Sequence, residues 1–211
     1  MLTCPLCHDT VSTQPFHTDS HRDFMKCSEC ELIFVHPKFL LNKEEEKSRY
    51  DLHMNCSDDP SYRRFLSQIL PPVFRFITHD SCGLDFGSGP EPSLQKLFQE
   101  HGYHIRIYDP FYAPDASVLK KKYDFIMATE VVEHLYTPLK TLNMVWNCLK
   151  PNGILAIMTQ THPPDFSNWW YKNDKTHVSF FSQKSFSFLN GYWKAKIVFQ
   201  ESNIILFKKL F

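Results

Sequence analysis

The stretch from Leu84 to Pro92 most constrains the fold, and it reads Leu-Asp-Phe-Gly-Ser-Gly-Pro-Glu-Pro. A short apolar segment ending at Cys82-Gly83 precedes it, and residues 93–98 follow with apolar side chains at helical spacing. This pattern predicts a buried strand, a tight turn and a helix. Gly87 and Gly89 let the backbone turn and approach a ligand with no Cβ in the way. The helix would present unpaired N–H groups at its start.

The turn by itself leaves two interpretations. Asp85, at the end of the strand, could accept hydrogen bonds from a cationic or hydroxyl-bearing ligand. The dinucleotide pattern Gly-x-Gly-x-x-Gly would need a third glycine where this chain has Pro92, which argues against a nicotinamide dehydrogenase. A tight turn in an α/β protein that binds nothing is the alternative.

A second signal lies about 20 residues downstream. Residues 103–108 alternate in polarity and are followed by Asp109-Pro110. In doubly wound folds, an acid at this spacing and at the end of the second strand holds the hydroxyls of a ribose. An aspartate that caps a turn before a proline is the alternative. Together, the glycine turn and Asp109 favour a nucleoside-like ligand.

The composition excludes several classes of protein. A chain of 211 residues can hold one sizeable core and a small appendage. Lysine plus arginine number 23 and aspartate plus glutamate number 23, which gives no strong field for nucleic acid or for an anionic membrane but leaves a local basic patch open. No apolar run is long enough to span a bilayer, and the first residues do not resemble a signal peptide. Seven cysteines without an export signal predict a reducing, cytoplasmic setting.

Four cysteines form the most specific pattern in the chain. Cys4 and Cys7 form one Cys-x-x-Cys pair and Cys27 and Cys30 a second, with 19 residues between the pairs. Such spacing predicts a closed tetrahedral zinc site with a structural role, in a small ribbon over residues 1–37. Metal binding would supply the folding energy of so small a unit. Two unrelated thiol pairs are the alternative, and the nearby histidines that could replace a thiol are His8, His17, His21 and His36.

Residues 38–80 form a predicted helical connector or lid. One helix should start at Asn42, and a second should cover residues 60–70 and stop at Pro71-Pro72. Three polar side chains between these helices could cover a ligand pocket, although solvated linker residues are the preferred interpretation: Tyr50, His53 and Asn55.

The predicted Rossmann-like domain covers residues 81–211. After the strands that end at Asp85 and Asp109, buried strands are predicted at 123–128 and 154–159. Only 13 residues separate Asp109 from Tyr123, so the third strand is missing or vestigial. The chain should end in an antiparallel strand over residues 203–209.

Taken together, four segments resemble class I S-adenosylmethionine-dependent methyltransferases: 84–89, 108–110, 123–135 and 149–155. Residues 170–182, which include the stretch 174–181, are similar to the substrate-side loop of short bacterial members, several of which carry an N-terminal CxxC…CxxC module. The resemblance implies an α/β fold with a Rossmann-like sheet and a small N-terminal zinc ribbon. The sequence departs from the family pattern in two places. Glu91 stands where the family has a third glycine, and the missing third strand removes the segment that borders the adenine.

The resemblance also implies roles for individual residues. Asp85, Gly87 and Gly89 would hold the methionine portion of the cofactor and Asp109 its ribose, while Thr129 and Glu130 would lie beside the methyl donor. His177 and His134 are candidates for the base that removes a proton from the acceptor, although either could instead be a structural residue bonded to backbone. The full predicted cofactor set is Asp85, Phe86, Gly87, Ser88, Gly89, Asp109, Pro110, Thr129 and Glu130.

Three functions compete at this point. A methyltransferase acting on a small-molecule acceptor is preferred because of the neutral charge and an aromatic loop at 169–171 that could wall the acceptor. An RNA methyltransferase that binds nucleic acid through the ribbon would need a basic face on the ribbon. The basic residues in or near the ribbon are only Arg22, Lys26 and Lys38. A non-catalytic adaptor is the third, favoured by Glu91.

Overall fold

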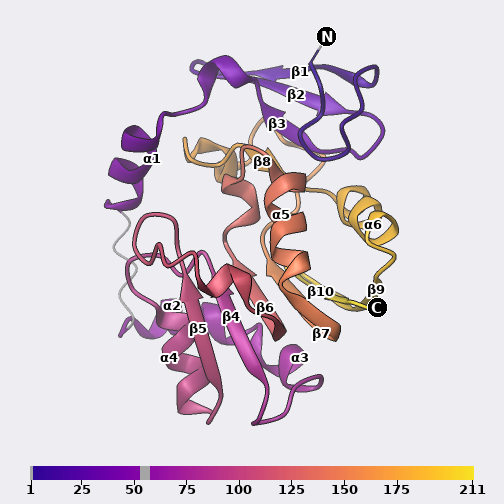
Figure 1. The fold of residues 1–211 in the computed structure, drawn as a ribbon. Coiled ribbons are helices and arrows are strands. Elements are labelled where there is room, and N and C mark those ends of the chain that lie inside the picture. Colours follow the sequence, from indigo (N-terminus) through magenta and orange to yellow (C-terminus); the bar gives the residue numbers. More distant parts are fainter. Residues whose placement is uncertain (1, 53–57) are drawn as a thin grey trace.

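The structure is a computed structural model that describes residues 2–52 and 58–211. It contains a six-stranded sheet of order β5-β4-β6-β7-β10-β9 and a four-stranded sheet of order β1-β2-β3-β8 (Figure 1). The predicted α/β fold with a Rossmann-like sheet is confirmed. The prediction for His53 and Asn55, as polar residues between the two connector helices, falls outside the described residues.

The large sheet is parallel in its first four strands and antiparallel at its C-terminal end. The parallel strands are β4 (Cys82–Phe86), β5 (His104–Tyr108), β6 (Tyr123–Thr129) and β7 (Leu149–Met158). β10 (Ile204–Lys208) pairs antiparallel with both β7 and β9 (Lys196–Glu201). The predicted closing antiparallel strand is therefore confirmed.

Helices cover both faces of this sheet. Alternate residues of β6 belong to two different clusters of buried side chains, as expected for a strand buried on both faces. Phe125 and Met127 pack with α2 (Pro60–Ser67), α3 (Leu70–Phe74) and α4 (Ser93–Glu100). Ile126 and Ala128 pack on the opposite face with α5 (Pro138–Asn147) and α6 (Gln183–Tyr192).

The third strand is absent, as predicted. Between Pro110 and Lys122, all of which the structure describes, the chain forms one isolated bridge from Asp109 to Ala113 and a 3-10 turn, η2 (Val118–Lys120). The short connection returns the chain directly to β6 and leaves β5 at the edge of the sheet.

Local helix signals were mostly correct. α1 (Lys43–Tyr50) begins with a capping box between Asn42 and Glu45. The single helix predicted over residues 60–70 was wrong, because α2 ends at Ser67 and Pro71-Pro72 lie in the first turn of α3. A proline is tolerated there since first-turn N–H groups have no partner within the helix.

The N-terminal sheet takes a strand from the other end of the chain. β1 (Thr13–Thr18), β2 (Asp23–Cys27) and β3 (Ile33–Val35) form an antiparallel meander, and β3 also pairs with β8 (Ser179–Phe180). Figure 1 shows β8, coloured as part of the C-terminal half, beside the indigo strands. The ribbon boundary at residue 37 stays a prediction, but the small sheet is completed only by residues far along the chain.

Arg22 adds a polar link between the ribbon and the loop that precedes β8. Its side chain is 6% exposed. The guanidinium donates to the backbone carbonyls of Lys172, Lys175 (3.3 Å) and His177 (3.0 Å). One cationic side chain therefore satisfies three carbonyl groups of a loop that has little regular structure.

None of the helices in the described ranges is long and apolar enough to cross a membrane.

We expect Arg22→Met to lower the free energy of unfolding by about 3 kcal/mol, because three carbonyl groups lose a charged donor. Urea unfolding should show a lower midpoint, and limited proteolysis should cut faster within residues 165–177. Arg75→Met, at an exposed arginine, is the matched control. Equal midpoints for Arg22→Met and wild type would show that the guanidinium does not hold the loop.

Candidate functional site

The candidate site lies where β4, β5 and β6 end. The N–H groups of Gly87 and Ser88 donate to the carbonyl oxygen of Tyr108, at 2.8 and 3.2 Å. The Gly89 N–H donates to Oδ2 of Asp109 at 3.0 Å. The glycine turn and the acid after β5 are thus joined by direct hydrogen bonds at the edge where ligands bind in such sheets.

Both glycines adopt the conformation for which glycine is needed. Gly87 has φ +83° and Gly89 has φ +66°. A Cβ at Gly87 would lie 2.4 Å from the nearer methyl carbon of Val131, so the turn packs directly against the segment after β6. At Gly89 a Cβ would meet no atom within 4 Å, which leaves open space beside the turn.

Asp109 caps a turn, as one of its two predicted roles requires, while its role toward a ribose stays a prediction. Its Oδ1 accepts from the N–H groups of Phe111 (2.8 Å) and Tyr112 (3.0 Å), which is a turn-capping arrangement. Its Oδ2 meanwhile bonds the glycine turn. The carboxylate, 7% exposed, therefore fixes the relative position of two segments that would border a nucleoside.

Asp85 is a buried acid at the end of β4. Burial and then the negative charge of Asp109 raise the pKa of Asp85 to about 7. Burial and the negative charges of Asp85 and Glu130 raise the pKa of Tyr62 to about 12. This effect places the Tyr62 side chain of α2 close to the same site, and no sequence signal had indicated it.

The other predicted cofactor residues occupy different settings. Phe86 is buried and stacks on Tyr108 with ring centroids 5.5 Å apart, so its side chain belongs to the core. Ser88 is half-buried within the turn and Pro110 is exposed. Glu91 stands where the resemblance implied a third glycine. Its side chain is exposed, with its carboxylate 3.6 Å from the Lys96 ammonium, and its φ is not positive.

After β6 the chain places two carboxylates around one hydroxyl. The Tyr171 hydroxyl donates to Glu130 (3.0 Å) and to Glu133, and Thr159 donates to the second oxygen of Glu133 at 3.0 Å. Glu130 has φ +54°, which is unusual for a residue with a side chain. Burial and the charge of Glu133 raise the pKa of Glu130 to about 8. The Glu130 Oε1 and Thr129 Oγ1 atoms are buried with no hydrogen-bond partner among the described residues.

The two predicted bases, His134 and His177, lie side by side. Their ring centroids are 4.7 Å apart. Nδ1 of His134 bonds the carbonyl oxygen of Thr176 at 3.1 Å, and Nδ1 of His177 bonds that of Tyr171 at 2.7 Å. Because a carbonyl only accepts, each Nδ1 carries the proton and each Nε2 carries the lone pair. Burial lowers the pKa of His134 to about 4.

Aromatic side chains of the connector and the 169–171 loop surround these histidines. Tyr50 of α1 lies edge-on to His134 with centroids 5.3 Å apart, so the interpretation of Tyr50 as a solvated linker residue was wrong. In the loop, Tyr171 is buried and Trp169 packs on Phe180. Trp170, 65% exposed, is the one member of residues 169–171 whose ring is free to meet an acceptor.

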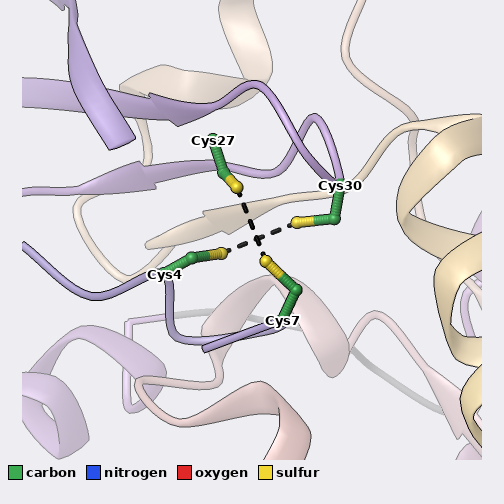
Figure 2. A group of neighbouring side chains, drawn as sticks. All are labelled: Cys4, Cys7, Cys27 and Cys30. Carbon is green, nitrogen blue, oxygen red and sulfur yellow. Dashed lines mark hydrogen bonds between the residues drawn. The ribbon is translucent and has the colours of Figure 1, made fainter. Parts of the chain in front are cut away.

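The four predicted metal ligands come together in the N-terminal ribbon. Two of them precede β1, and the other two lie at and just after the end of β2. Figure 2 shows the sulfur atoms of Cys4, Cys7, Cys27 and Cys30 pointing at a common centre. The Cys4–Cys30 and Cys7–Cys27 sulfur distances are 3.6 and 3.5 Å, and all four sulfurs lie within 4.8 Å of one another. Tetrahedral Zn–S bonds of about 2.3 Å require sulfur–sulfur distances of about 3.8 Å. The donor set and its spacing therefore fit zinc.

Comparison with known proteins gives a family. The profile described as "Methyltransferase domain" matches residues 58–190, more than half of the chain. The chain belongs to the methyltransferase domain family. The enzyme class predicted from the sequence is thereby confirmed.

Solved structures agree in fold. A Burkholderia thailandensis 1,6-didemethyltoxoflavin-N1-methyltransferase is similar at 15% identity and TM-score 0.55, over 94% of this chain and 100% of that chain. A SAM-dependent methyltransferase from Archaeoglobus fulgidus is similar at 16% identity and TM-score 0.54, over 70% and 94% of the two chains. A search of curated proteins found no match for this methyltransferase.

The sequence analysis missed three members of the site: Glu133, Tyr171 as a hydrogen-bond donor, and Thr159. Glu133 stands three residues after Glu130, and that spacing could have indicated a pair of acids on one turn. The contribution of Thr159 and Tyr171 depends on contacts across 26 and 38 residues.

Asp85→Asn should stabilise the folded protein at pH 8 and leave it unchanged at pH 4. The pKa of Asp85 is about 7 in the folded state and 3.8 in the unfolded state. Between these pH values the folded protein keeps a proton on Asp85 that the unfolded chain loses. The free energy of unfolding therefore falls as pH rises from about 4 to about 7. At about 1.4 kcal/mol per pKa unit, the gain at pH 8 is on the order of 2–4 kcal/mol. Urea titrations at both pH values measure it.

Asp80→Asn, at an exposed acid, is the control and should show no such pH dependence. If Asp85→Asn were less stable than wild type at pH 8, neighbouring groups would have to stabilise the Asp85 carboxylate.

Proposed function

We propose that this methyltransferase transfers the methyl group of S-adenosylmethionine to a small-molecule acceptor. The observation that carries the proposal is the hydrogen bond from the Gly89 N–H to Asp109. It joins the glycine turn to the acid at the ribose position. The similar Burkholderia thailandensis enzyme was solved with 1,6-didemethyltoxoflavin and S-adenosylhomocysteine bound, which supports both parts of the proposal.

In this proposal the cofactor lies across the ends of β4, β5 and β6. Asp85 and the turn of Phe86, Gly87, Ser88 and Gly89 bind the methionine portion, Asp109 and Pro110 border the ribose, and Thr129 and Glu130 lie beside the sulfonium. The raised pKa values of Asp85 and Glu130 support this assignment. Buried carboxyl groups without a cation suit a cofactor that brings two positive charges, because binding would pair the charges and favour their ionisation.

The chain's part in the reaction is to bind, orient and exclude water. The reactive carbon is supplied by the cofactor, and the acceptor must attack in line with the carbon–sulfur bond. His177 and His134 remain the candidates for removing the acceptor's proton, and in each the available atom is Nε2. A pKa of about 4 makes His134 the weaker base near neutral pH.

Two observations weigh against the competing functions. Arg22, one of the few basic residues of the ribbon, is buried on loop carbonyls, so its charge is not presented to RNA. Glu91, the residue that favoured a non-catalytic adaptor, is exposed in an unstrained backbone conformation. Neither feature therefore supports RNA methylation or a non-catalytic adaptor.

Calorimetric titration of S-adenosylmethionine into the protein tests the function. We expect micromolar binding by wild type and at least about tenfold weaker binding by Asp109→Ala, since the turn and the ribose position lose their common carboxylate. Asp115→Ala, at an exposed acid a few residues away, should bind as wild type does. A folded wild-type protein that binds no S-adenosylmethionine would overturn the proposal.

We also propose that Cys4, Cys7, Cys27 and Cys30 hold a structural zinc ion. Four protein ligands close the coordination shell and leave no position for a substrate. The hydrogen bond from Cys30 lowers the pKa of Cys4 to about 6, while burial raises that of Cys7 to about 12. A divalent cation would relieve the repulsion that keeps the four sulfurs from ionising together. The cytoplasmic location inferred from the cysteines stays a prediction.

Removing zinc should unfold the ribbon first and expose the loop before β8. Metal analysis should find one zinc per chain in wild type and in Cys82→Ser, the control outside the cluster, but less than one in Cys27→Ser. A strong chelator should lower the melting temperature of wild type to that of Cys27→Ser. Equal melting temperatures with and without chelator would show that the metal does not stabilise the fold.

A further inference from the structure

We propose that Glu133, His134 and His177 form a second metal site, for a divalent transition-metal ion, beside the methyl-transfer centre. Glu130, which shares the Tyr171 hydroxyl with Glu133, is a further oxygen donor. The inference rests on the proposed function for the position of the methyl donor. It assigns to these residues a ligand that methyl transfer itself does not require.

The geometry is that of a preformed site. One ligand atom from each of Glu133, His134 and His177 lies within 4.8 Å of the other two. Ligand atoms about 2.1 Å from a common ion lie roughly 3–4.2 Å apart. Small side-chain adjustments therefore suffice to bring all three donors to one ion. Glu133 is 1% exposed and His177 7%, so bulk water does not compete freely for the position.

Backbone hydrogen bonds hold both histidine rings, as is common for the rings of metal ligands. Both Nδ1 atoms are bonded to backbone carbonyls, of Thr176 and Tyr171, which fixes the tautomer and leaves both Nε2 lone pairs available. Metal-binding histidines characteristically donate their other ring N–H to a carbonyl or carboxylate, because this fixes the ring and strengthens the ligand. The two imidazoles receive this support independently, from different carbonyls.

The charge around Glu133 points to a missing cation. Glu130 and Glu133 both accept from Tyr171, so two acids lie close together in a largely buried position. Within residues 2–52 and 58–211, neither forms an ion pair with lysine or arginine. Buried carboxylates are ordinarily paired or bound to a metal. The buried and unpartnered Oε1 of Glu130 is consistent with the same explanation.

The ligand set indicates the kind of metal. Imidazole nitrogens with carboxylate oxygens suit Mn²⁺, Fe²⁺, Co²⁺ or Zn²⁺, whereas Mg²⁺ and Ca²⁺ prefer oxygen ligands alone. An ion here would lower the pKa of an acceptor hydroxyl bound to it. The hydroxyl proton would pass to water, the oxygen would bond to the methyl carbon, and the carbon–sulfur bond would break with its electron pair going to sulfur. The site therefore favours an oxygen acceptor.

One nitrogen atom cannot hold a metal and take a proton at the same time. The proposal therefore assigns His134 and His177 as ligands and removes them as general bases.

Titration with Mn²⁺ of protein that holds one zinc per chain, at the four cysteines, tests this site when electron paramagnetic resonance follows the free ion. Thiolates bind Mn²⁺ poorly, so the probe reports on nitrogen and oxygen ligands rather than on the cysteines. We expect one bound Mn²⁺ per chain, and at least tenfold weaker binding by His177→Ala and Glu133→Gln. His104→Ala, which removes an exposed histidine, is the matched control and should bind as wild type does.

Glu133→Gln keeps the size of the side chain and one of its two acceptor oxygens, so it tests the carboxylate ligand even if His177→Ala fails to fold. Folding of each variant is checked by circular dichroism. No Mn²⁺ binding at millimolar concentration by wild type, or equal binding by wild type and both ligand variants, would overturn the metal site. Calorimetry with S-adenosylmethionine on the same samples distinguishes this failure from failure of the proposed function, because the cofactor would still bind.

Discussion

The pairing of β3 with β8 is the contact on which the arrangement of the site depends. It joins residues 33–34 to residues 179–180, and the side chains around it form a separate buried cluster. Arg22 reinforces the pairing from the ribbon side by binding three carbonyls of the preceding loop. On the other side, the Val178 N–H donates to the Glu133 carbonyl at 2.8 Å. The loop that carries Tyr171 and His177 is therefore held between the ribbon and the end of β6.

This arrangement connects the N-terminal module to the site through the β3–β8 pairing. If the cysteines hold zinc, the metal fixes the ribbon, the ribbon fixes β3, and β3 fixes β8 and the loop before it. A structural metal can then influence activity through packing alone, because the loop lies between the ribbon and the segment after β6.

The carboxyl edge of the large sheet gathers acidic side chains whose ionisation is disfavoured in the part of the protein that the structure describes. Asp85 and Glu130 both have raised pKa values, and Glu130 also adopts a left-handed backbone conformation. Each of these features costs stability. Their occurrence in one place is expected of a site that binds a positively charged cofactor, since the ligand restores the lost interaction energy when it binds.

The sequence by itself determined the local features. The glycines of the turn, the acid after β5, the cysteine spacing and the capping box at Asn42 could all be predicted, because each depends on residues close together in the chain. The tertiary structure alone decided the β3–β8 pairing, the clamp by Arg22, the position of Tyr50 against His134, and the sharing of Tyr171 by two glutamates. These contacts join residues separated by 38 to 155 positions. Hydrophobic periodicity reports which face of an element is buried, but not which distant element buries it, so such contacts follow only from the packing of the whole chain.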